Sequence, residues 1–149
     1  MKIKQLAHVV FRVRDLDRSK RWYQDVMGLK LMADIPGRMA LFSANESVSH
    51  ELGLMQISPN APGPDSNRVG MYHAGWQVES LDDMVNLKSR LEAKGVDVVG
   101  VGDHGISIGV YVKDPDGNEL EFFYELPPAE WPANGDIFVG RFPTPVDVY

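Results

Sequence analysis

The segment His8-Val-Val-Phe-Arg-Val-Arg-Asp-Leu-Asp17 returns in related form as His73-Ala-Gly-Trp-Gln-Val-Glu-Ser-Leu-Asp82. Histidine, valine, leucine and aspartate each recur at an offset of 65 residues (8 to 73, 13 to 78, 16 to 81 and 17 to 82). Phe11 is matched by Trp76 at the same offset. A shared offset at five positions of one short segment indicates an internal repeat, so we expect two similar modules in one chain.

Each copy of the repeat begins with the alternating pattern of a β-strand. In the first copy, Phe11 and Val13 share one face, while His8 lies on the opposite and more polar face. In the second copy, Trp76 likewise lies on one face and His73 on the opposite face. Because apolar faces pack against helices, both histidines are expected on the face that the helices do not cover.

A helix and three further strands are expected after each opening strand. Asp15 can cap a helix over residues 16–27 that Gly28 ends, and Ser80 can cap a second helix that Gly95 ends. The later strands are expected at residues 30–34, 39–43 and 50–57 in the first half, and at 96–101, 106–112 and 119–125 in the second. The pattern is βαβββ, twice, which predicts an α+β fold.

The chain is expected to form a single domain over residues 1–149, made of these two modules. Asp114-Pro-Asp-Gly117 predicts a tight turn, because proline presets φ and glycine supplies a positive φ. The expected segments are a first module at about 5–58, a linker rich in Pro, Gly, Ser and Asn at 59–68, a second module at about 69–126, and a C-terminal tail at 127–149.

Composition narrows the classes of function. The chain has 149 residues, a formal net charge of -6 and no cysteine, which excludes a disulfide framework, a thiolate metal site and a cysteine nucleophile. Excess acidity argues against nucleic-acid binding, and no apolar run approaches the length of a membrane span. We expect a cytoplasmic protein with neither nucleic acid nor membrane as a partner.

The histidines at equivalent repeat positions suggest a metal site. An isolated strand histidine is more often a hydrogen-bonded residue than a ligand, but His8 and His73 occupy matching places in the two copies. With a carboxylate such as Glu121, they would make the ligand set of two histidines and one carboxylate associated with non-heme Fe(II) oxygen chemistry. On pattern alone, Glu121 fits a solvated strand face equally well.

The stretch from Gly102 to Glu121 carries a more specific pattern. His104 is followed after five residues by Val110-Tyr111, after two more by Asp114-Pro-Asp-Gly117, and after three more by Glu121. This order and spacing resembles the type I extradiol ring-cleavage dioxygenases, of catechol 2,3-dioxygenase type, in the vicinal oxygen chelate or glyoxalase–bleomycin resistance superfamily. The Asp-Pro-Asp-Gly turn and later Glu are widespread in that superfamily, so His104 and Tyr111 carry the specificity.

The resemblance covers about residues 5–126 and implies a one-domain vicinal oxygen chelate fold, a cupped mixed β-sheet with helices outside. It implies an Fe(2+) cofactor, or Mn(2+) with the same ligands, and ring cleavage of a catechol-type substrate by O2 in aromatic hydrocarbon catabolism. A homo-oligomer, dimer or higher, is also implied. The site residues implied are the metal ligands His8, His73 and Glu121, the acid/base His50, and the substrate-contacting His104 and Tyr111.

Two other functions remain open from the sequence. Glu51 follows His50, and glyoxalase I relatives use a glutamate on this strand as a fourth metal ligand. Neighbouring strand residues point to opposite faces, so an inward Glu51 would favour a glyoxalase- or epimerase-like enzyme and an inward His50 an oxygenase. A metal-free binding or resistance protein is the third reading. Trp131, Phe138, Phe142 and Tyr149 in the tail suit either a packed chain end or a lid over the pocket.

Overall fold

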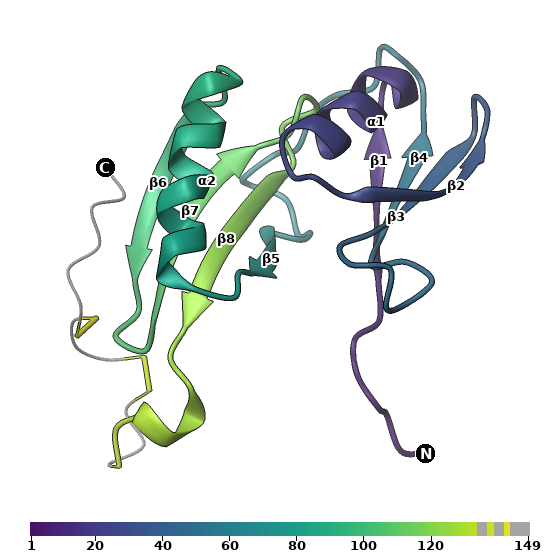
Figure 1. Ribbon diagram of the computed structural model, residues 1–149. Helices are drawn as coiled ribbons and strands as arrows, with labels where there is room; N and C mark the ends of the chain where they lie inside the picture. The colour runs from purple at the N-terminus through teal and green to yellow at the C-terminus, as the bar shows by residue number, and fades with distance from the viewer. Residues whose placement is uncertain (134–136, 139–141, 144–149) are drawn as a thin grey trace. The chain divides into compact units, whose positions relative to one another are not determined.

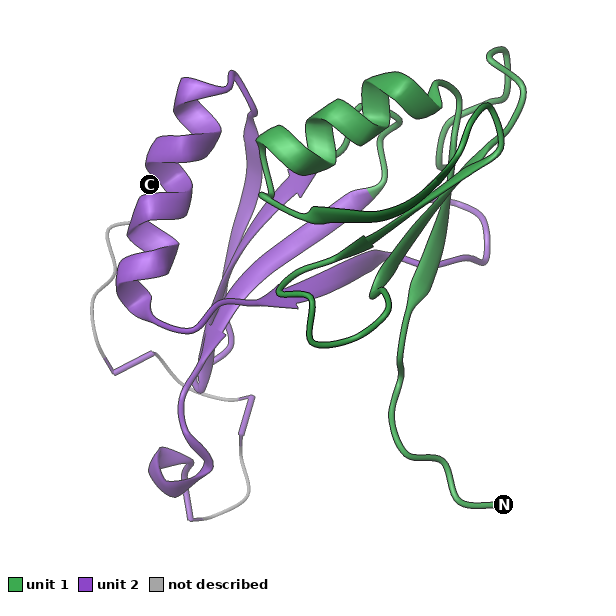
Figure 2. Cartoon of the chain, turned by 45° about the vertical axis from the view of Figure 1, so that its right-hand side comes forward, with its two compact units in different colours: residues 1–65, 114–118 green, residues 66–113, 119–149 purple. Residues whose placement is uncertain are grey.

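The computed structural model describes residues 1–133, 137–138 and 142–143, and the chain divides into two compact units. Unit 1 comprises residues 1–65 and 114–118, and unit 2 comprises residues 66–113 and 119–149 (Figure 2). Tyr149 of the predicted tail lies outside the described residues. Across the described part of the chain, no helix is both long and apolar enough to cross a membrane.

Unit 1 contains a four-stranded mixed sheet with one helix (Figure 1). The strand order is β1-β4-β3-β2, with β1 parallel to β4 and the other neighbours antiparallel. Its elements are β1 (Val9–Val13), α1 (Leu16–Asp25), β2 (Lys30–Ile35), β3 (Met39–Ser43) and β4 (Leu52–Gln56).

Unit 2 repeats this topology in the order β5-β8-β7-β6, with β5 parallel to β8. Its elements are β5 (His73–Gln77), α2 (Leu81–Ala93), β6 (Val98–Asp103), β7 (Ser107–Lys113) and β8 (Glu119–Glu125), followed by the short 3-10 helix η1 (Pro128–Glu130). Both sheets are therefore built by one βαβββ pattern. The predicted α+β fold with two βαβββ modules is confirmed.

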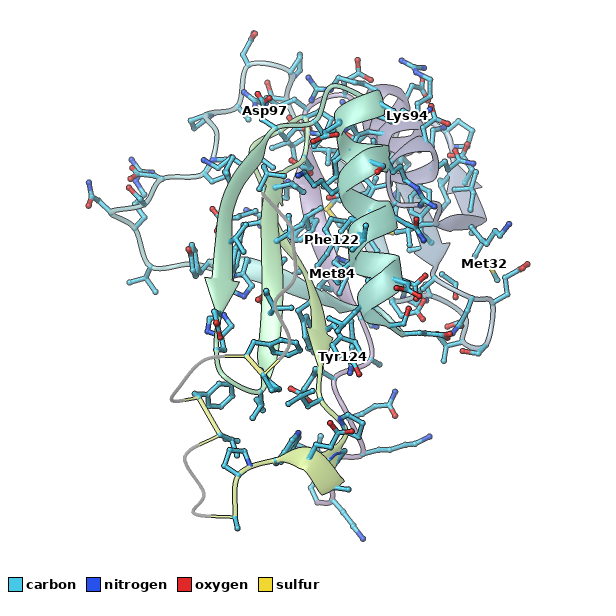
Figure 3. All side chains as sticks on the ribbon, turned by 60° about the vertical axis from the view of Figure 1, so that its left-hand side comes forward. Met32, Met84, Lys94, Asp97, Phe122 and Tyr124 are labelled. Atoms are coloured by element: carbon cyan, nitrogen blue, oxygen red, sulfur yellow. The ribbon has the colours of Figure 1, made fainter. Side chains whose placement is uncertain are left out.

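Each helix covers the apolar face of its own sheet. In unit 1, Leu16 and Tyr23 of α1 are buried together with Phe11 of β1. In unit 2, Met84 of α2 and Phe122 of β8, both labelled in Figure 3, lie in the core between the helix and the sheet. This packing leaves the other face of each sheet open, and the open faces carry the polar residues that the sequence singled out.

The predicted caps begin both helices. The first helix, α1, ends at Asp25, two residues before the predicted end, and Gly28 with φ of +75° follows it. The Asp15 side chain accepts the Arg18 amide at 2.9 Å, and the Ser80 hydroxyl accepts the Asp83 amide at 3.1 Å. Gly95, with φ of +65°, ends the hydrogen-bonded turns of α2 in the left-handed conformation that glycine favours.

Two strands start two residues later than the sequence pattern indicates. The strand expected at 96–101 begins at Val98, because the Val96 amide donates to the Leu91 carbonyl and still belongs to the end of α2. The strand expected at 50–57 is β4, Leu52–Gln56. His50 and Glu51 precede it, and the Glu51 carboxylate accepts the Ala44 amide at 3.2 Å in the connection from β3.

The turn between β7 and β8 is held by unit 1. Asp114 accepts the Asp116 and Asn118 amides at 2.8 and 2.9 Å through Oδ1, and the Tyr23 hydroxyl at 2.9 Å through Oδ2. Buried Asp116 accepts Arg14 Nε and Arg18 Nη2, each at 2.7 Å. Residues 114–118 therefore belong to unit 1, although the strands on either side of them belong to unit 2.

Asp116→Asn is expected to lower the free energy of unfolding by about 1–3 kcal/mol near neutral pH, because it weakens charged hydrogen bonds in a buried place. Burial acts to raise the pKa of Asp116, but the hydrogen bonds from Arg14 and Arg18 outweigh it, and the net pKa lies below the ordinary 3.8. A lowered folded-state pKa stabilises the fold above the unfolded-state pKa, and this stabilisation is lost as pH falls through the folded-state value.

The difference between wild type and Asp116→Asn should therefore shrink as pH falls below about 4, measured by urea unfolding. Asp17→Asn is the matched control, because Asp17 forms an exposed pair with Lys20 at 2.8 Å on the same helix as Arg18. It should leave the unfolding midpoint nearly unchanged. Equal effects of the two substitutions would contradict a buried anchor at Asp116.

Candidate metal and substrate site

Glu121 is the centre of a polar cluster on the open sheet face of unit 2. In the strand register it lies between Gly75 of β5 and Tyr111 of β7. Tyr111 donates its hydroxyl proton to Glu121 Oε1 at 2.8 Å, and His73 Nε2 lies 3.2 Å from Glu121 Oε2. The Glu121 side chain is only 12% exposed, so its carboxylate is directed by these neighbours and little by water.

His104 joins the same cluster from the turn after β6. Its Nε2 lies 3.1 Å from the Tyr111 hydroxyl oxygen and 3.7 Å from Glu121 Oε1. Since the phenol proton is directed to Glu121, the hydrogen bond between the imidazole and the phenol requires His104 Nε2–H as the donor. We call His73, His104, Tyr111 and Glu121 the unit 2 cluster, and it contains all four site residues that the sequence predicted in this unit.

The phenol of Tyr111 remains a proton donor in this setting. Burial raises the pKa of Tyr111 well above its ordinary value of 10.0, and the hydrogen bond to Glu121 raises it further. A neutral phenol therefore directs one oxygen of Glu121, while the second oxygen remains directed to His73.

Glycines beneath the cluster make room for it. A Cβ built on Gly109 of β7 would overlap the carboxylate of Glu121. A Cβ on Gly102 of β6 would lie 2.9 Å from His104 Nε2 and 3.1 Å from Tyr111 Cε2. Neither glycine was predicted as a site residue. The signal was available, because glycine inside a strand commonly marks a close approach.

His8 and His50 lie together in unit 1. Their ring centroids are 4.5 Å apart with an interplanar angle of 38°, and Ser49 Oγ lies 3.1 Å from His50 Nδ1. The Glu51 side chain instead accepts the Ala44 amide. Of the two neighbours whose direction the sequence left open, His50 is the one that packs against the predicted ligand His8.

The internal repeat shows which position in unit 1 corresponds to Glu121. Glu121 pairs with Gly75, which is Val10 in the first copy, and Val10 pairs with Gly53. A Cβ added at Gly53 would lie 3.1 Å from Val10 Cγ2. Unit 1 therefore carries no carboxylate at the position equivalent to Glu121.

The unit 2 cluster supplies two of the three predicted metal ligands. His73 Nε2 and Glu121 Oε2 face one another, and imidazole nitrogen with carboxylate oxygen is a donor pair that divalent transition metals accept. His73 Nδ1 is buried and has no hydrogen-bond partner, so Nε2 makes the polar contact of this ring. The donor set fits a divalent metal in its chemistry, with His8, in unit 1, as the remaining predicted ligand.

Within the described ranges, no group of three or more His, Cys, Asp or Glu residues is arranged to hold a metal ion.

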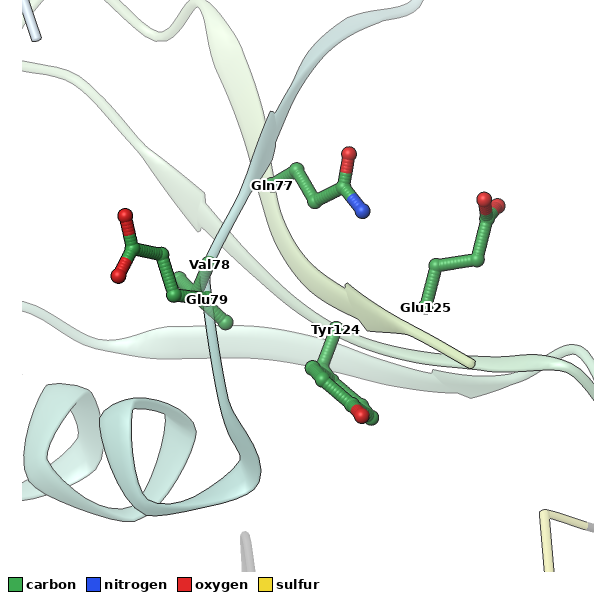
Figure 4. Close-up of a pocket in the computed structure, with 5 residues that line it drawn as sticks. All are labelled: Gln77, Val78, Glu79, Tyr124 and Glu125. Atoms are coloured by element: carbon green, nitrogen blue, oxygen red, sulfur yellow. The ribbon is translucent and has the colours of Figure 1, made fainter. Parts of the chain in front are cut away.

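A pocket of about 330 Å³ opens at the C-terminal ends of β5 and β8 (Figure 4). Its lining residues are Gln77, Val78, Glu79, Tyr124 and Glu125, none of which is a predicted site residue.

Comparison with known proteins identifies the relatives of this chain. The family model described as Glyoxalase/Bleomycin resistance protein/Dioxygenase superfamily matches residues 5–122. A catechol-2,3-dioxygenase of Bacillus subtilis (strain 168) is 25% identical over 144 residues, which are 96% of this chain and 49% of that protein. The chain thus spans about half the length of this curated dioxygenase.

Other relatives carry a different activity or show the fold alone. A lactoylglutathione lyase of Neisseria meningitidis serogroup B (strain ATCC BAA-335 / MC58) is 30% identical over 125 residues, covering 79% of this chain and 88% of that protein. The crystal structure of a glyoxylase/bleomycin resistance protein/dioxygenase domain from Frankia sp. EAN1pec superposes with a TM-score of 0.71 at 24% identity, covering 83% of this chain and 99% of that one.

Proposed function

Because the chain belongs to the Glyoxalase/Bleomycin resistance protein/Dioxygenase superfamily, we propose that it is an Fe(II)-dependent extradiol dioxygenase that opens the ring of a catechol with O2. The observation that carries this proposal is the convergence of His104 and Tyr111 on Glu121. These two residues distinguish the extradiol pattern within the superfamily, and a glyoxalase-like site gives them no role.

In this proposal His8, His73 and Glu121 hold Fe(II), and Mn(II) accepts the same ligands. The bound metal supplies the exchange of electrons between the catechol ring and dioxygen, which a redox-inactive ion does not. Glu121 suits the role because its Oε1 is engaged by Tyr111, while Oε2 is directed to the other ligand of this unit, His73.

His50 is the proposed acid/base, because an imidazole can both donate and accept a proton and its ring packs against His8. His104 and Tyr111 are proposed to orient the catechol and to hydrogen-bond the negative charge that develops on it. Both present N–H or O–H donors on the face that holds Glu121.

The open face of unit 1 suits an aromatic substrate. By strand alternation, His8 shares this face with Val10, which is 43% exposed. Met55 of β4, which pairs with the next residue of β1 on this face, Arg12, is 40% exposed. Apolar side chains next to a few polar groups are typical of small-molecule sites. A substituted catechol would cover this apolar surface, whereas a purely polar substrate would leave it in water.

A glyoxalase-like isomerase is the second candidate, since a lactoylglutathione lyase is a relative of similar identity over a larger share of its own length. Two observations weigh against it. Gly53 stands where a fourth ligand equivalent to Glu121 would lie, and the Glu51 carboxylate is engaged by the Ala44 amide. Both favour three protein ligands over four.

The test is anaerobic reconstitution with Fe(II), followed by addition of a panel of catechols, admission of air, and measurement of oxygen uptake and coloured ring-fission products. We expect uptake that depends on both iron and catechol. An assay with the thiol adduct of an α-oxoaldehyde runs in parallel. Activity on that adduct without oxygen uptake would replace the proposal by the isomerase, and metal-independent ligand binding alone would replace it by a binding protein.

His50→Phe is expected to lower kcat by about 10²–10⁴-fold, the usual contribution of a positioned acid/base, while iron remains bound. Iron content and oxygen uptake are measured on the same samples. Glu51→Gln is the matched control from the adjacent position, and it should keep both iron and turnover. Loss of iron in the Glu51 variant would instead identify that carboxylate as a ligand.

A further inference from the structure

The carboxylate of Asp103 connects the turn that carries His104 to the C-terminal segment. Asp103 is the last residue of β6, and its Oδ1 accepts the Gly105 amide at 2.9 Å. The Phe142 amide donates to both oxygens of the same carboxylate, at 3.0 and 3.2 Å. The Asp103 carboxylate therefore joins the two residues that flank His104 in the chain, Asp103 and Gly105. It also accepts a hydrogen bond from Phe142, 39 positions away.

Phe142 is anchored by its ring as well as by its amide. The side chain is buried, with 8% exposed, and its ring packs edge-on against Tyr124 of β8 at a centroid distance of 6.2 Å. Phe138, on the same segment, is 67% exposed. Phe142 is therefore buried in a specific contact, whereas Phe138 is exposed. Substitution of Phe138 can serve as the control for the same substitution of Phe142.

The position of the His104 ring depends on this turn. The side chain is 41% exposed, and it makes one hydrogen bond, to Tyr111 at 3.1 Å, beside a longer approach of 3.7 Å to Glu121 Oε1. The backbone of the turn is closed by the bond from the His104 amide to the Ser107 carbonyl. A half-exposed side chain with one hydrogen bond depends on its backbone for its position, so groups that hold the backbone also set the direction of the ring.

We propose that Phe142 and Asp103 are positioning residues for His104, and that docking of the C-terminal segment on Asp103 sets the affinity of the site for its substrate. The proposal rests on the role of His104 as a substrate contact in the proposed dioxygenase. It assigns the tail a function at the base of the site, distinct from a lid over the pocket. Without the Phe142 contact, the Asp103 carboxylate still accepts the Gly105 amide and closes the turn. The turn then has no contact with the C-terminal segment that would fix its orientation.

The test compares Phe142→Ala, Asp103→Ala and their double variant with Phe138→Ala as control, all in the full chain. The first readout needs no substrate: the imidazole ¹⁵N signals of the metal-free protein, with the His104 signal assigned by its loss in His104→Gln. Phe142→Ala and Asp103→Ala should both shift the His104 signal while leaving that of His8, in unit 1, in place. Phe138→Ala should shift neither.

The second readout is the split between KM and kcat for the catechol that gives the highest turnover. KM is expected to rise about tenfold in each single variant, the equivalent of one hydrogen bond, with a much smaller change in kcat. The double variant should resemble Asp103→Ala, because both changes act through one contact. Additive effects on KM would contradict the coupling.

The two readouts separate this inference from the proposed function. An unchanged His104 signal in Phe142→Ala, with the protein folded as judged by its unfolding midpoint, overturns the positioning role whatever the enzyme does. A shifted signal in a protein that turns over no catechol would leave the positioning role standing and reject the dioxygenase.

Discussion

Replacing Glu121 by glutamine is expected to abolish stable iron binding and, with it, oxygen uptake on catechols. The amide retains the size of the side chain and can still accept the Tyr111 hydroxyl, but it removes the negative charge directed to His73 Nε2. Loss of a direct carboxylate ligand should exceed the roughly 10–100-fold loss of metal affinity that follows removal of a group behind a ligand. Iron retained after equilibrium dialysis measures the effect.

Glu119→Gln is the control, because Glu119 is on the same strand and the same face as Glu121. Its carboxylate accepts a hydrogen bond from Tyr72, which raises the pKa of that phenol. The control should bind iron as the wild type does. If the two variants retain equal amounts of iron, Glu121 is a solvated strand residue, the alternative that its sequence pattern also allows.

Gly109→Ala is expected to disable the site while leaving the fold in place. The added methyl group would overlap the Glu121 carboxylate and would lie 3.1 Å from both Cγ and Cδ of Glu121. The Glu121 side chain must therefore leave its contacts with Tyr111 and His73. Overpacking of this kind costs about 1–3 kcal/mol of stability. Iron affinity should fall by about 10–100-fold, since the carboxylate remains in the chain but is displaced.

Gly100→Ala provides the comparison for this steric argument. A Cβ there would lie 3.7 Å from Tyr111 Cδ2, which is an ordinary van der Waals contact. Both substitutions replace glycine by alanine on the open face of the same sheet, so both change the intrinsic strand propensity of the residue in the same way. Thermal unfolding and iron content should therefore differ between them, and indistinguishable variants would show that the clearance at Gly109 is not what positions Glu121.

Local chemistry made much of the fold predictable. Asp15 and Ser80 cap their helices as expected, since capping depends on residues three positions apart in the chain. The strands at 39–43 and 119–125 have the predicted bounds. The assignment of residues 114–118 to unit 1 was not predictable, because Arg14 is about a hundred positions from its partner Asp116 and no periodic pattern links them.

The site was predictable to a lesser extent. The resemblance carried by His104, Tyr111 and Glu121 implied that they line one site. Alternation in the paired strands β7 and β8 brings Tyr111 and Glu121 to one face, and His104 joins them from the turn after β6. The choice between His50 and Glu51 was not predictable, because both precede β4 and their side chains are directed by contacts outside that strand. His50 packs against the His8 ring, and Glu51 accepts the Ala44 amide. The bond between Asp103 and Phe142 joins a turn to an irregular segment, and neither has a pattern that names a partner.

The most direct test of the central claim is mass spectrometry of the product formed from a catechol by the Fe(II)-loaded protein under ¹⁸O₂. An extradiol dioxygenase should consume one molecule of O2 per catechol and yield a ring-opened product that contains both atoms of that molecule, with partial loss of label from any group that exchanges with water. A product without label, or turnover that is the same under argon, would contradict the account.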